Sequence, residues 1–184
     1  NPAGFEVLVL NVRYSELVEE NAIAALLGYH PEARIVAGTD QTERARHLRK
    51  HSGVPVVQTM DVTDTPIDLN IGLDHGAAGA AAVRYLYELG HRKIAHLTAR
   101  ADPRARRRHA GYQRQMDAYG LSTAGLVGAS PRPSDVAMGG ELLGEVLAAV
   151  PDVSAVFTCN DDLALGTLFE CQRRGIGVPE EIAI

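Results

Sequence analysis

Asn160 is the residue whose type and position point most directly to ligand chemistry. It follows the apolar stretch of residues 155–159 and precedes Asp161 and Asp162, which open a pattern of helical spacing. Its amide oxygen can cap that helix, and acids in a first helical turn favour the helix dipole. Its two N–H donors remain able to face a hydroxyl-rich ligand. The sequence leaves both interpretations open, a plain helix cap or a cap that also binds a ligand.

A cluster of arginines lies at the expected start of another helix, predicted near residues 106–119, where positive charge opposes the helix dipole. Most of such a charge run is expected to be solvated, but local rules are broken mainly at functional sites. We therefore expect one of the four to hold an oxygen-rich or carboxylate-bearing ligand through its forked guanidinium. The cluster comprises Arg104, Arg106, Arg107 and Arg108.

Asp61 is a further candidate. It is predicted to lie in a polar loop just beyond a buried strand, where its carboxylate can accept hydrogen bonds from sugar hydroxyls. An aspartate that makes a local turn explains the same position equally well. Both interpretations stay open at this point.

Residue types that carry metal or redox chemistry occur without the required spacing. Cys159 and Cys171 form neither a Cys-x-x-Cys pair nor a zinc-finger pattern, and no two of the seven histidines have convincing ligand spacing. We expect two buried reduced thiols, structural or solvated histidines, and no metal site.

The strongest enzyme signatures are absent from the sequence. It has no Gly-x-x-x-x-Gly-Lys-Ser/Thr phosphate loop, no Gly-x-Ser-x-Gly elbow and no His-Glu-x-x-His helix. Gly76 and Gly79 sit at a helix start without the rest of a dinucleotide fingerprint, so we expect them to serve close packing. The sequence predicts no catalytic residue and no cofactor.

The elements that must position these residues alternate between strands and helices, which favours a doubly wound α/β architecture with parallel sheets and helices on both faces. A hinge near residues 70–74 divides the chain into two lobes, and a small ligand is expected in the crevice between them. Strands are predicted at residues 5–10, 34–37, 54–58, 93–98, 126–129 and 155–159. The expected helix caps are Ser15, Asp40, Asp74, Ser134 and Asn160.

Composition narrows the class of protein. The 184 residues are 46% apolar, which is ample for a packed core, and the formal net charge of -5 argues against a surface devoted to nucleic acid. No apolar run reaches the roughly 18 residues of a membrane span. We expect a soluble protein that does not bind DNA strongly through this chain.

Five short motifs occur in order along the second half of the chain. They are Asp74 with Gly79, Gly90-His-Arg-Lys-Ile-Ala, Arg108-x-x-Gly-Tyr, Asn160-Asp-Asp-Leu-Ala-Leu-Gly and Val178-Pro-Glu-Glu-Ile-Ala. This ordered set resembles the effector-binding domain of the lac repressor (LacI/GalR) family, and the similarity covers nearly the whole chain. The run Phe157-Thr-Cys-Asn-Asp-Asp with Glu170-Cys-Gln-Arg-Arg-Gly is most similar to the gluconate-responsive branch of that family.

The resemblance implies a periplasmic-binding-protein-like α/β fold with two doubly wound parallel-sheet lobes, here incomplete. Residues 1–72 are expected to form the N-terminal lobe without its first βα unit, and residues 73–184 the C-terminal lobe, cut before its final crossover. The resemblance further implies a cytoplasmic homodimer that binds a sugar or sugar acid between its lobes. That ligand alters the binding of operator DNA by a helix-turn-helix headpiece that this chain lacks.

The resemblance also implies a set of ligand-binding residues. Arg108 falls where the family's effector-binding arginine lies, and Asn160 falls where a polar residue reaches the ligand; a sugar acid would give Arg108 a carboxylate. Asp61 resembles a ligand-contacting aspartate of the sugar-binding members. The complete set is Arg108, Asn160, Asp61, Ser134, Asp40 and Thr39.

Two other functions remain as alternatives. A periplasmic sugar-binding protein of a transporter shares the two-lobe architecture, and fold alone cannot separate it from a repressor. A Rossmann-like enzyme would need an acid–base pair or a cofactor fingerprint, and neither is found in the sequence.

Overall fold

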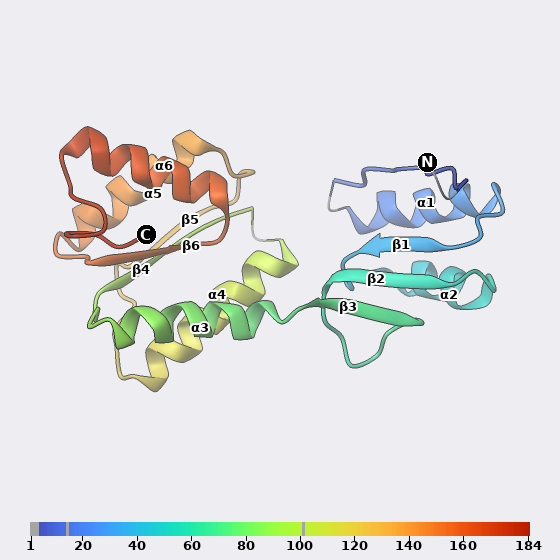
Figure 1. Ribbon diagram of the computed structural model, residues 1–184, viewed down its shortest axis with the longest axis horizontal. Coiled ribbons are helices and arrows are strands. Elements are labelled where there is room, and N and C mark those ends of the chain that lie inside the picture. The colour runs from blue at the N-terminus through green and yellow to red at the C-terminus, as the bar shows by residue number, and fades with distance from the viewer. Residues whose placement is uncertain (1–3, 14, 101) are drawn as a thin grey trace. The chain divides into compact units, whose positions relative to one another are not determined.

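The computed structural model describes residues 4–13, 15–100 and 102–184. The chain divides into two compact units, residues 1–73 and residues 74–184. Within the described residues each unit holds one three-stranded sheet, in the order β1-β2-β3 in the first unit and β5-β4-β6 in the second (Figure 1). All strand pairs are parallel, as predicted. A helix lies between the two strands along the chain in most of these connections, whereas residues 62–68 join β2 to β3 without a helix.

The first unit builds its sheet from three short strands and two helices. Residues 34–37 form the predicted strand. The second strand begins two residues later than the predicted residues 54–58 and ends three residues later, at Asp61, where it pairs with the third strand. The elements in chain order are α1 (Glu16–Leu27), β1 (Arg34–Ala37), α2 (Glu43–His51), β2 (Val56–Asp61) and β3 (Leu69–Leu73).

One of the two predicted helix caps in the first unit is confirmed. Ser15 caps α1, with its hydroxyl accepting a hydrogen bond from the backbone N–H of Val18 at 3.3 Å. The prediction that Asp40 caps α2 is wrong, because Thr42 is the cap and accepts from the backbone N–H of Ala45 at 3.0 Å. The same threonine hydroxyl donates to Glu20 of α1 at 2.6 Å. A contact between two helices therefore favours threonine over aspartate, although both residue types cap helices.

The strand predicted at residues 5–10 is not formed. These residues are neither helix nor strand, and their apolar side chains are exposed, 75% for Val7 and 83% for Val9. A strand exists only through a hydrogen-bonded ladder to a neighbour, and among the described residues β1 pairs with β2 and with no other strand. An apolar run alone therefore does not make a strand here.

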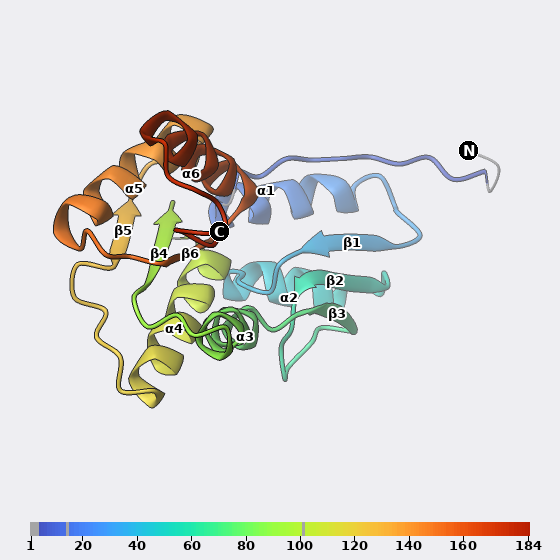
Figure 2. The same cartoon turned by 60° about the vertical axis from the view of Figure 1, so that its left-hand side comes forward.

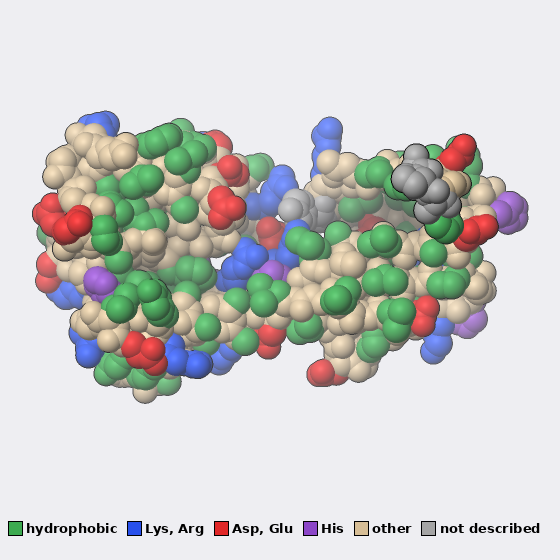
Figure 3. All heavy atoms as spheres, viewed as in Figure 1, with side chains coloured by type: hydrophobic (Ala, Val, Ile, Leu, Met, Phe, Trp, Pro, Cys, Tyr) green, Lys and Arg blue, Asp and Glu red, His purple; other side chains and the backbone are tan. Residues whose placement is uncertain are grey.

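One face of the first sheet is apolar and exposed. The register aligns Ile35 with Val57 and Val57 with Leu69, and the exposed fractions are 79% for Ile35, 62% for Leu69 and 69% for Ile71. Figure 3 shows hydrophobic side chains over the part of the view that β1, β2 and β3 occupy. Parallel sheets are normally covered on both faces, so this unit is only partly covered by the described residues.

The second unit is covered on both faces of its sheet. The pair α3 and α4 lies on one face and the pair α5 and α6 on the other (Figures 1 and 2). The predicted strands are displaced by no more than one residue, and the last helix begins at Asp161, directly after its predicted cap. The elements are α3 (His75–Glu88), β4 (Ile94–Ala99), α4 (Pro103–Ala118), β5 (Val127–Ser130), α5 (Val136–Ala149), β6 (Ala155–Thr158) and α6 (Asp161–Arg174).

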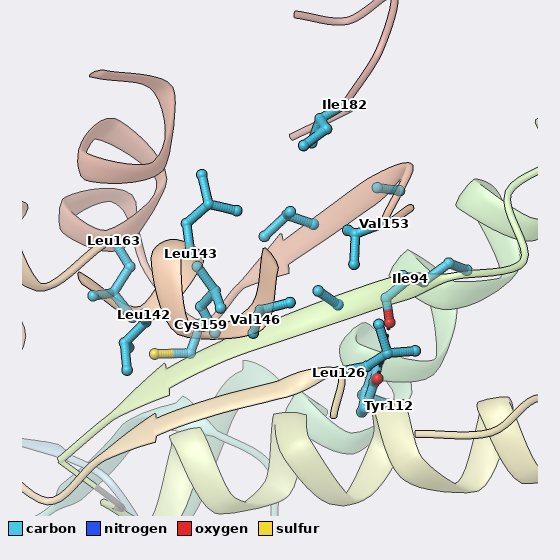
Figure 4. Close-up of a cluster of buried hydrophobic side chains, with 14 of the residues drawn as sticks. Ile94, Tyr112, Leu126, Leu142, Leu143, Val146, Val153, Cys159, Leu163 and Ile182 are labelled. Atoms are coloured by element: carbon cyan, nitrogen blue, oxygen red, sulfur yellow. Dashed lines mark hydrogen bonds between the residues drawn. The ribbon is translucent and has the colours of Figure 1, made fainter. Parts of the chain in front are cut away.

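The hydrophobic core of the second unit forms between these helix pairs and the sheet (Figure 4). One face of α4 is part of it, since Tyr112 and Met116 are 0% exposed. The Tyr112 hydroxyl donates to the backbone oxygen of Ile94 at 2.9 Å, which satisfies its polar group inside the core. Burial raises the pKa of Tyr112, so this donor keeps its proton.

Glycines let each helix pair approach to backbone contact. A Cβ added at Gly79 of α3 would overlap the backbone oxygen of Arg108 in α4, and one added at Gly111 would overlap that of Gly76. In the other pair, a Cβ at Gly166 would overlap the backbone oxygen of Val136. The prediction that these glycines serve close packing is confirmed for Gly79, whereas a Cβ added at Gly76 would lie 3.2 Å from Nη2 of the Arg114 side chain and would overlap no backbone atom.

Two adjacent glycines of α5 offer a matched test of this packing. A Cβ added at Gly139 would overlap the backbone oxygen of Leu163, whereas one added at Gly140 would lie 3.4 Å from the Cβ of Glu170, an ordinary contact. We expect Gly139→Ala to lower the free energy of unfolding by about 2 kcal/mol or more. We expect Gly140→Ala to leave it unchanged or raise it by up to about 1 kcal/mol, because alanine favours a helix.

Urea denaturation of both variants followed by circular dichroism checks this prediction. Equal effects of the two substitutions would contradict it, because helix propensity would then outweigh the backbone contact.

Candidate functional site

A polar pocket opens in the second unit at the carboxyl end of β6. Its volume is about 350 Å³. Ligands of open α/β sheets bind at the carboxyl ends of the strands, which is the end where this pocket lies. Its lining comprises Ala78 of α3, Arg108 of α4 and the consecutive residues Phe157, Thr158, Cys159, Asn160 and Asp161.

Asn160 stands between β6 and α6 and is held by two hydrogen bonds. Its Oδ1 accepts from the backbone N–H of Leu163 at 3.1 Å, so the predicted helix cap is confirmed. Its Nδ2 donates to the hydroxyl of Ser134 at 2.8 Å. The acids of the first turn, Asp161 and Asp162, lie at the positive end of the helix dipole. The carboxamide is thus fixed at the edge of the pocket, while its contact with a ligand stays a prediction.

Ser134 does not cap α5, which corrects the sequence analysis. The cap is Asp135, whose carboxylate accepts from the backbone N–H of Met138 at 2.8 Å. Serine and aspartate are both good caps, so the path of the loop between β5 and α5 decides between these neighbours. The Ser134 hydroxyl is consequently available to Asn160 of α6.

Arg108 is the member of the arginine cluster that lines the pocket. Its Nη1 donates to the backbone oxygen of Cys159 at 2.5 Å, which ties α4 to the end of β6. The helix α4 begins at Pro103, earlier than predicted, with Asp102 as its cap. The carboxylate of Asp102 accepts from the backbone N–H groups of Arg104 and Ala105 and sets a negative charge at the helix start, where the arginines alone would oppose the dipole.

The other predicted ligand residues lie in the first unit. Asp61 does not lie in a loop, because it is the last residue of β2 and pairs in register with Leu73 of β3, and it is only 2% exposed. Its carboxylate lies beside the turn after β1, where a Cβ added at Gly38 would be 3.7 Å from Oδ2. Thr39 and Asp40 belong to that turn. Asp61 ends β2 and the turn follows β1, its parallel neighbour, so the structure brings the three residues to one edge of the first sheet. Their ligand role stays a prediction.

A buried aromatic cluster supports the pocket from inside the second unit. His96 of β4 is 0% exposed, and its ring stacks with Phe157 at 4.9 Å, with Tyr112 at 5.0 Å and with His109 at 5.4 Å between ring centroids. Its Nδ1 lies 2.9 Å from the backbone oxygen of Phe157 and donates to it in the neutral ring. Burial, with smaller contributions from the neighbouring His109 and Arg108, lowers the pKa of His96 to about 4 against the opposing effect of the Phe157 oxygen.

Sequence reasoning missed part of the pocket. The backbone oxygen of Cys159 that holds Arg108 leaves no signal in the sequence, since every residue carries such an oxygen. Phe157 and Thr158 are predicted only as strand residues, yet they line the pocket. Their position shortly before Asn160 is the signal that places them at the same strand end. Ala78 is brought to the pocket by the packing of α3 on α4.

Neither a metal-binding cluster nor a membrane-spanning helix is found among the described residues. In the described part of the chain, no three His, Cys, Asp or Glu side chains are arranged to hold a metal ion. Among the same residues, no helix combines the length and the apolar character needed to span a membrane.

Comparison with known proteins gives consistent matches. Residues 1–184 match the model of a family described as periplasmic binding proteins and sugar binding domain of the LacI family. The HTH-type transcriptional regulator GntR of Pseudomonas aeruginosa is 43% identical over all of the chain and 53% of its own length. The HTH-type transcriptional regulator IdnR of Escherichia coli is 32% identical over 98% of the chain and 54% of its own length. The chain thus spans about half the length of these curated relatives.

A solved structure agrees with these matches. The crystal structure of the transcription regulator GntR from Chromobacterium violaceum superposes with a TM-score of 0.92 at 37% identity, over 100% of the chain and 67% of that protein. The predicted fold class is confirmed, since the whole chain follows the backbone of such a regulator.

The buried state of His96 predicts a pH-dependent stability. An unfolded histidine has a pKa of about 6.5, so between roughly pH 6.5 and 4 the unfolded chain binds a proton that the folded chain does not. The stability present above pH 6.5 is therefore lost as the pH falls, by up to about 3 kcal/mol from this group. Urea denaturation at several pH values between 7 and 4.5 measures the loss.

We expect His96→Leu to remove this part of the pH dependence, and the substitution of the exposed His47 by leucine to retain it. An unchanged loss of stability in His96→Leu would assign the effect to other groups.

Proposed function

Because this chain belongs to the family of periplasmic binding proteins and sugar-binding domains of the LacI family, we propose that it is the effector-binding domain of a bacterial transcriptional repressor that senses a sugar acid such as gluconate. The observation that carries the proposal is the convergence of Arg108 and Asn160 from two different helices on one pocket. Both residue types can donate hydrogen bonds to an oxygen-rich ligand.

The side chains of the pocket suit an anionic, hydroxyl-bearing ligand. Arg108 offers donors alone, and Asn160 offers its amide N–H because its oxygen is used by Leu163. A carboxylate matches these donors and the positive charge of Arg108. Asp161 supplies an acceptor for a hydroxyl group, and Thr158 can donate or accept. A sugar acid carries both kinds of group.

The repressor assignment is supported by the relatives, which are named as transcriptional regulators with a helix-turn-helix. Operator DNA is contacted, in this proposal, by such a headpiece outside these 184 residues, since the net charge of -5 suits this chain poorly to a phosphate backbone. The same relatives favour a repressor over a transporter's periplasmic sugar-binding protein. The site of action of the complete protein is then the cytoplasm.

A homodimer completes the proposal. Two apolar side chains one turn apart on α6 are exposed, 42% for Leu165 and 50% for Phe169. An apolar stripe on the outer face of a packed helix is suited to burial against a second copy of the chain.

The ligand proposal predicts a thermal shift. Gluconate at about 100 times its dissociation constant should stabilise the complete protein by about 2.7 kcal/mol, and this is measured as a rise in melting temperature. We expect Arg108→Ala to weaken gluconate binding by more than about tenfold, because a charge-assisted hydrogen bond to the carboxylate is lost.

The control is Arg106→Ala, which removes the same charge from an exposed position of α4 outside the lining of the pocket. We expect this variant to bind like the parent protein. Equal losses in both variants would point to a general electrostatic effect, and the absence of any response to sugars or sugar acids in a wide screen would refute the proposed function.

A further inference from the structure

We infer that Ser134 is a positioning residue that acts through Asn160: its hydroxyl holds the carboxamide in the orientation that the helix cap sets, so that Asn160 offers the pocket an N–H donor and thereby favours acidic over neutral sugars. This inference rests on the proposed function and deepens it. It assigns Ser134 a different role from the direct ligand contact that the resemblance implied.

The orientation of the Asn160 carboxamide follows from its two partners. The backbone N–H of Leu163 can only donate, so the atom that faces it at 3.1 Å must be the amide oxygen. The amide nitrogen is then the atom that lies 2.8 Å from the Ser134 hydroxyl, which accepts one of its two N–H groups. With the oxygen used by the cap and one N–H used by Ser134, the second N–H is the group left for a ligand.

The position of Ser134 is set by the packing of α5 on α6 and not by capping of α5. Asp135 caps α5, so the Ser134 hydroxyl is not engaged by the first turn of that helix. The next residue, Val136, has its backbone oxygen against Gly166 of α6, where a Cβ would overlap it. This backbone contact fixes the start of α5 against α6, and it holds the serine within reach of Asn160.

A direct contact of Ser134 with the ligand is less well supported. Asn160 is among the described residues that line the pocket, and Ser134 is not. The serine therefore contacts Asn160 without itself lining the pocket. A residue in that place affects binding by limiting how the asparagine can turn.

The orientation decides which ligand chemistry is favoured. Arg108 and Asn160 line the same pocket, so a firmly held Asn160 N–H gives that pocket a second donor, which suits a carboxylate with its several acceptor positions. Without the serine, the helix cap is the one remaining contact of the two, so the carboxamide can turn about its terminal torsion and its N–H groups are held less firmly toward the carboxylate. A neutral sugar is less sensitive, because its hydroxyl groups both donate and accept.

The first test compares ligands by titration calorimetry on the complete protein, with gluconate and glucose as probes. We expect Ser134→Ala to weaken gluconate binding by about five- to tenfold and glucose binding by less, so that the ratio of the two affinities falls. We expect Ser134→Thr, which keeps the hydroxyl, to restore the ratio to within about twofold. The matched control Ser122→Ala removes a hydroxyl that lies outside the pocket and should leave both affinities unchanged.

A second variant inverts the chemistry and keeps the helix cap. In Asn160→Asp the carboxylate still accepts from Leu163, and the Ser134 hydroxyl can turn to donate to it. We expect a folded protein whose affinity for gluconate is reduced more than a hundredfold, with a smaller loss for glucose. Equal losses for the two probes would overturn the assigned selectivity.

A measurement without ligand separates this inference from the proposed function. In an NMR spectrum of the parent protein, one proton of the Asn160 side-chain amide should exchange slowly with solvent, and Ser134→Ala should speed that exchange by at least about tenfold. An Asn160 amide that is unaffected by Ser134→Ala overturns the positioning role, whatever the ligand. If the parent protein binds no sugar acid, the proposed function fails and the selectivity fails with it, while the NMR result still decides the contact.

Discussion

The contact of helix backbones within each pair is the constraint on which the second unit depends. At Gly79, Gly111, Gly139 and Gly166 there is no room for a Cβ, because a backbone atom of the partner helix occupies its place. Interiors are packed so tightly that a single methyl group is felt, and here the neighbour is a backbone that cannot turn aside. Each helix pair consequently behaves as one body with a fixed position on its face of the sheet.

This constraint carries the two candidate ligand residues into one place. Gly79 of α3 packs against the backbone of Arg108, so this contact fixes the position from which the Arg108 side chain extends. Its bond to the Cys159 oxygen then anchors it to the residue directly before Asn160. Binding groups held by rigid elements and supporting hydrogen bonds keep their geometry, which a site on free loops would not. The buried His96 beneath Phe157 adds stiffness to the same strand end.

The first unit is held together differently. Its helices are joined by polar contacts, the buried ion pair of Arg49 with Glu19 at 2.6 Å and the bond of Thr42 to Glu20. Arg34 lies beside them, with its Nη2 on the Ser52 hydroxyl and the backbone oxygen of Arg49, and burial and the charge of Arg49 lower its pKa. Buried ion pairs add little stability but demand one geometry. The helices of this unit are thus joined by polar contacts, and one face of its sheet is apolar and exposed. In both respects it differs from the second unit, whose sheet is covered on both faces.

The sequence by itself determined the alternation of strands and helices and the caps at Asp74 and Asn160, because these depend on neighbours within one turn or one strand. The parallel sheets follow from that alternation, since a helix between two strands favours their parallel pairing. It also contained the family motifs. Tertiary structure alone decided that residues 5–10 form no strand, that Asp61 is buried within β2, and that the Ser134 hydroxyl accepts a hydrogen bond from the residue that caps α6. Each of these depends on a partner far away in the chain, a neighbouring strand or a packed helix, and local spacing carries no information about that partner.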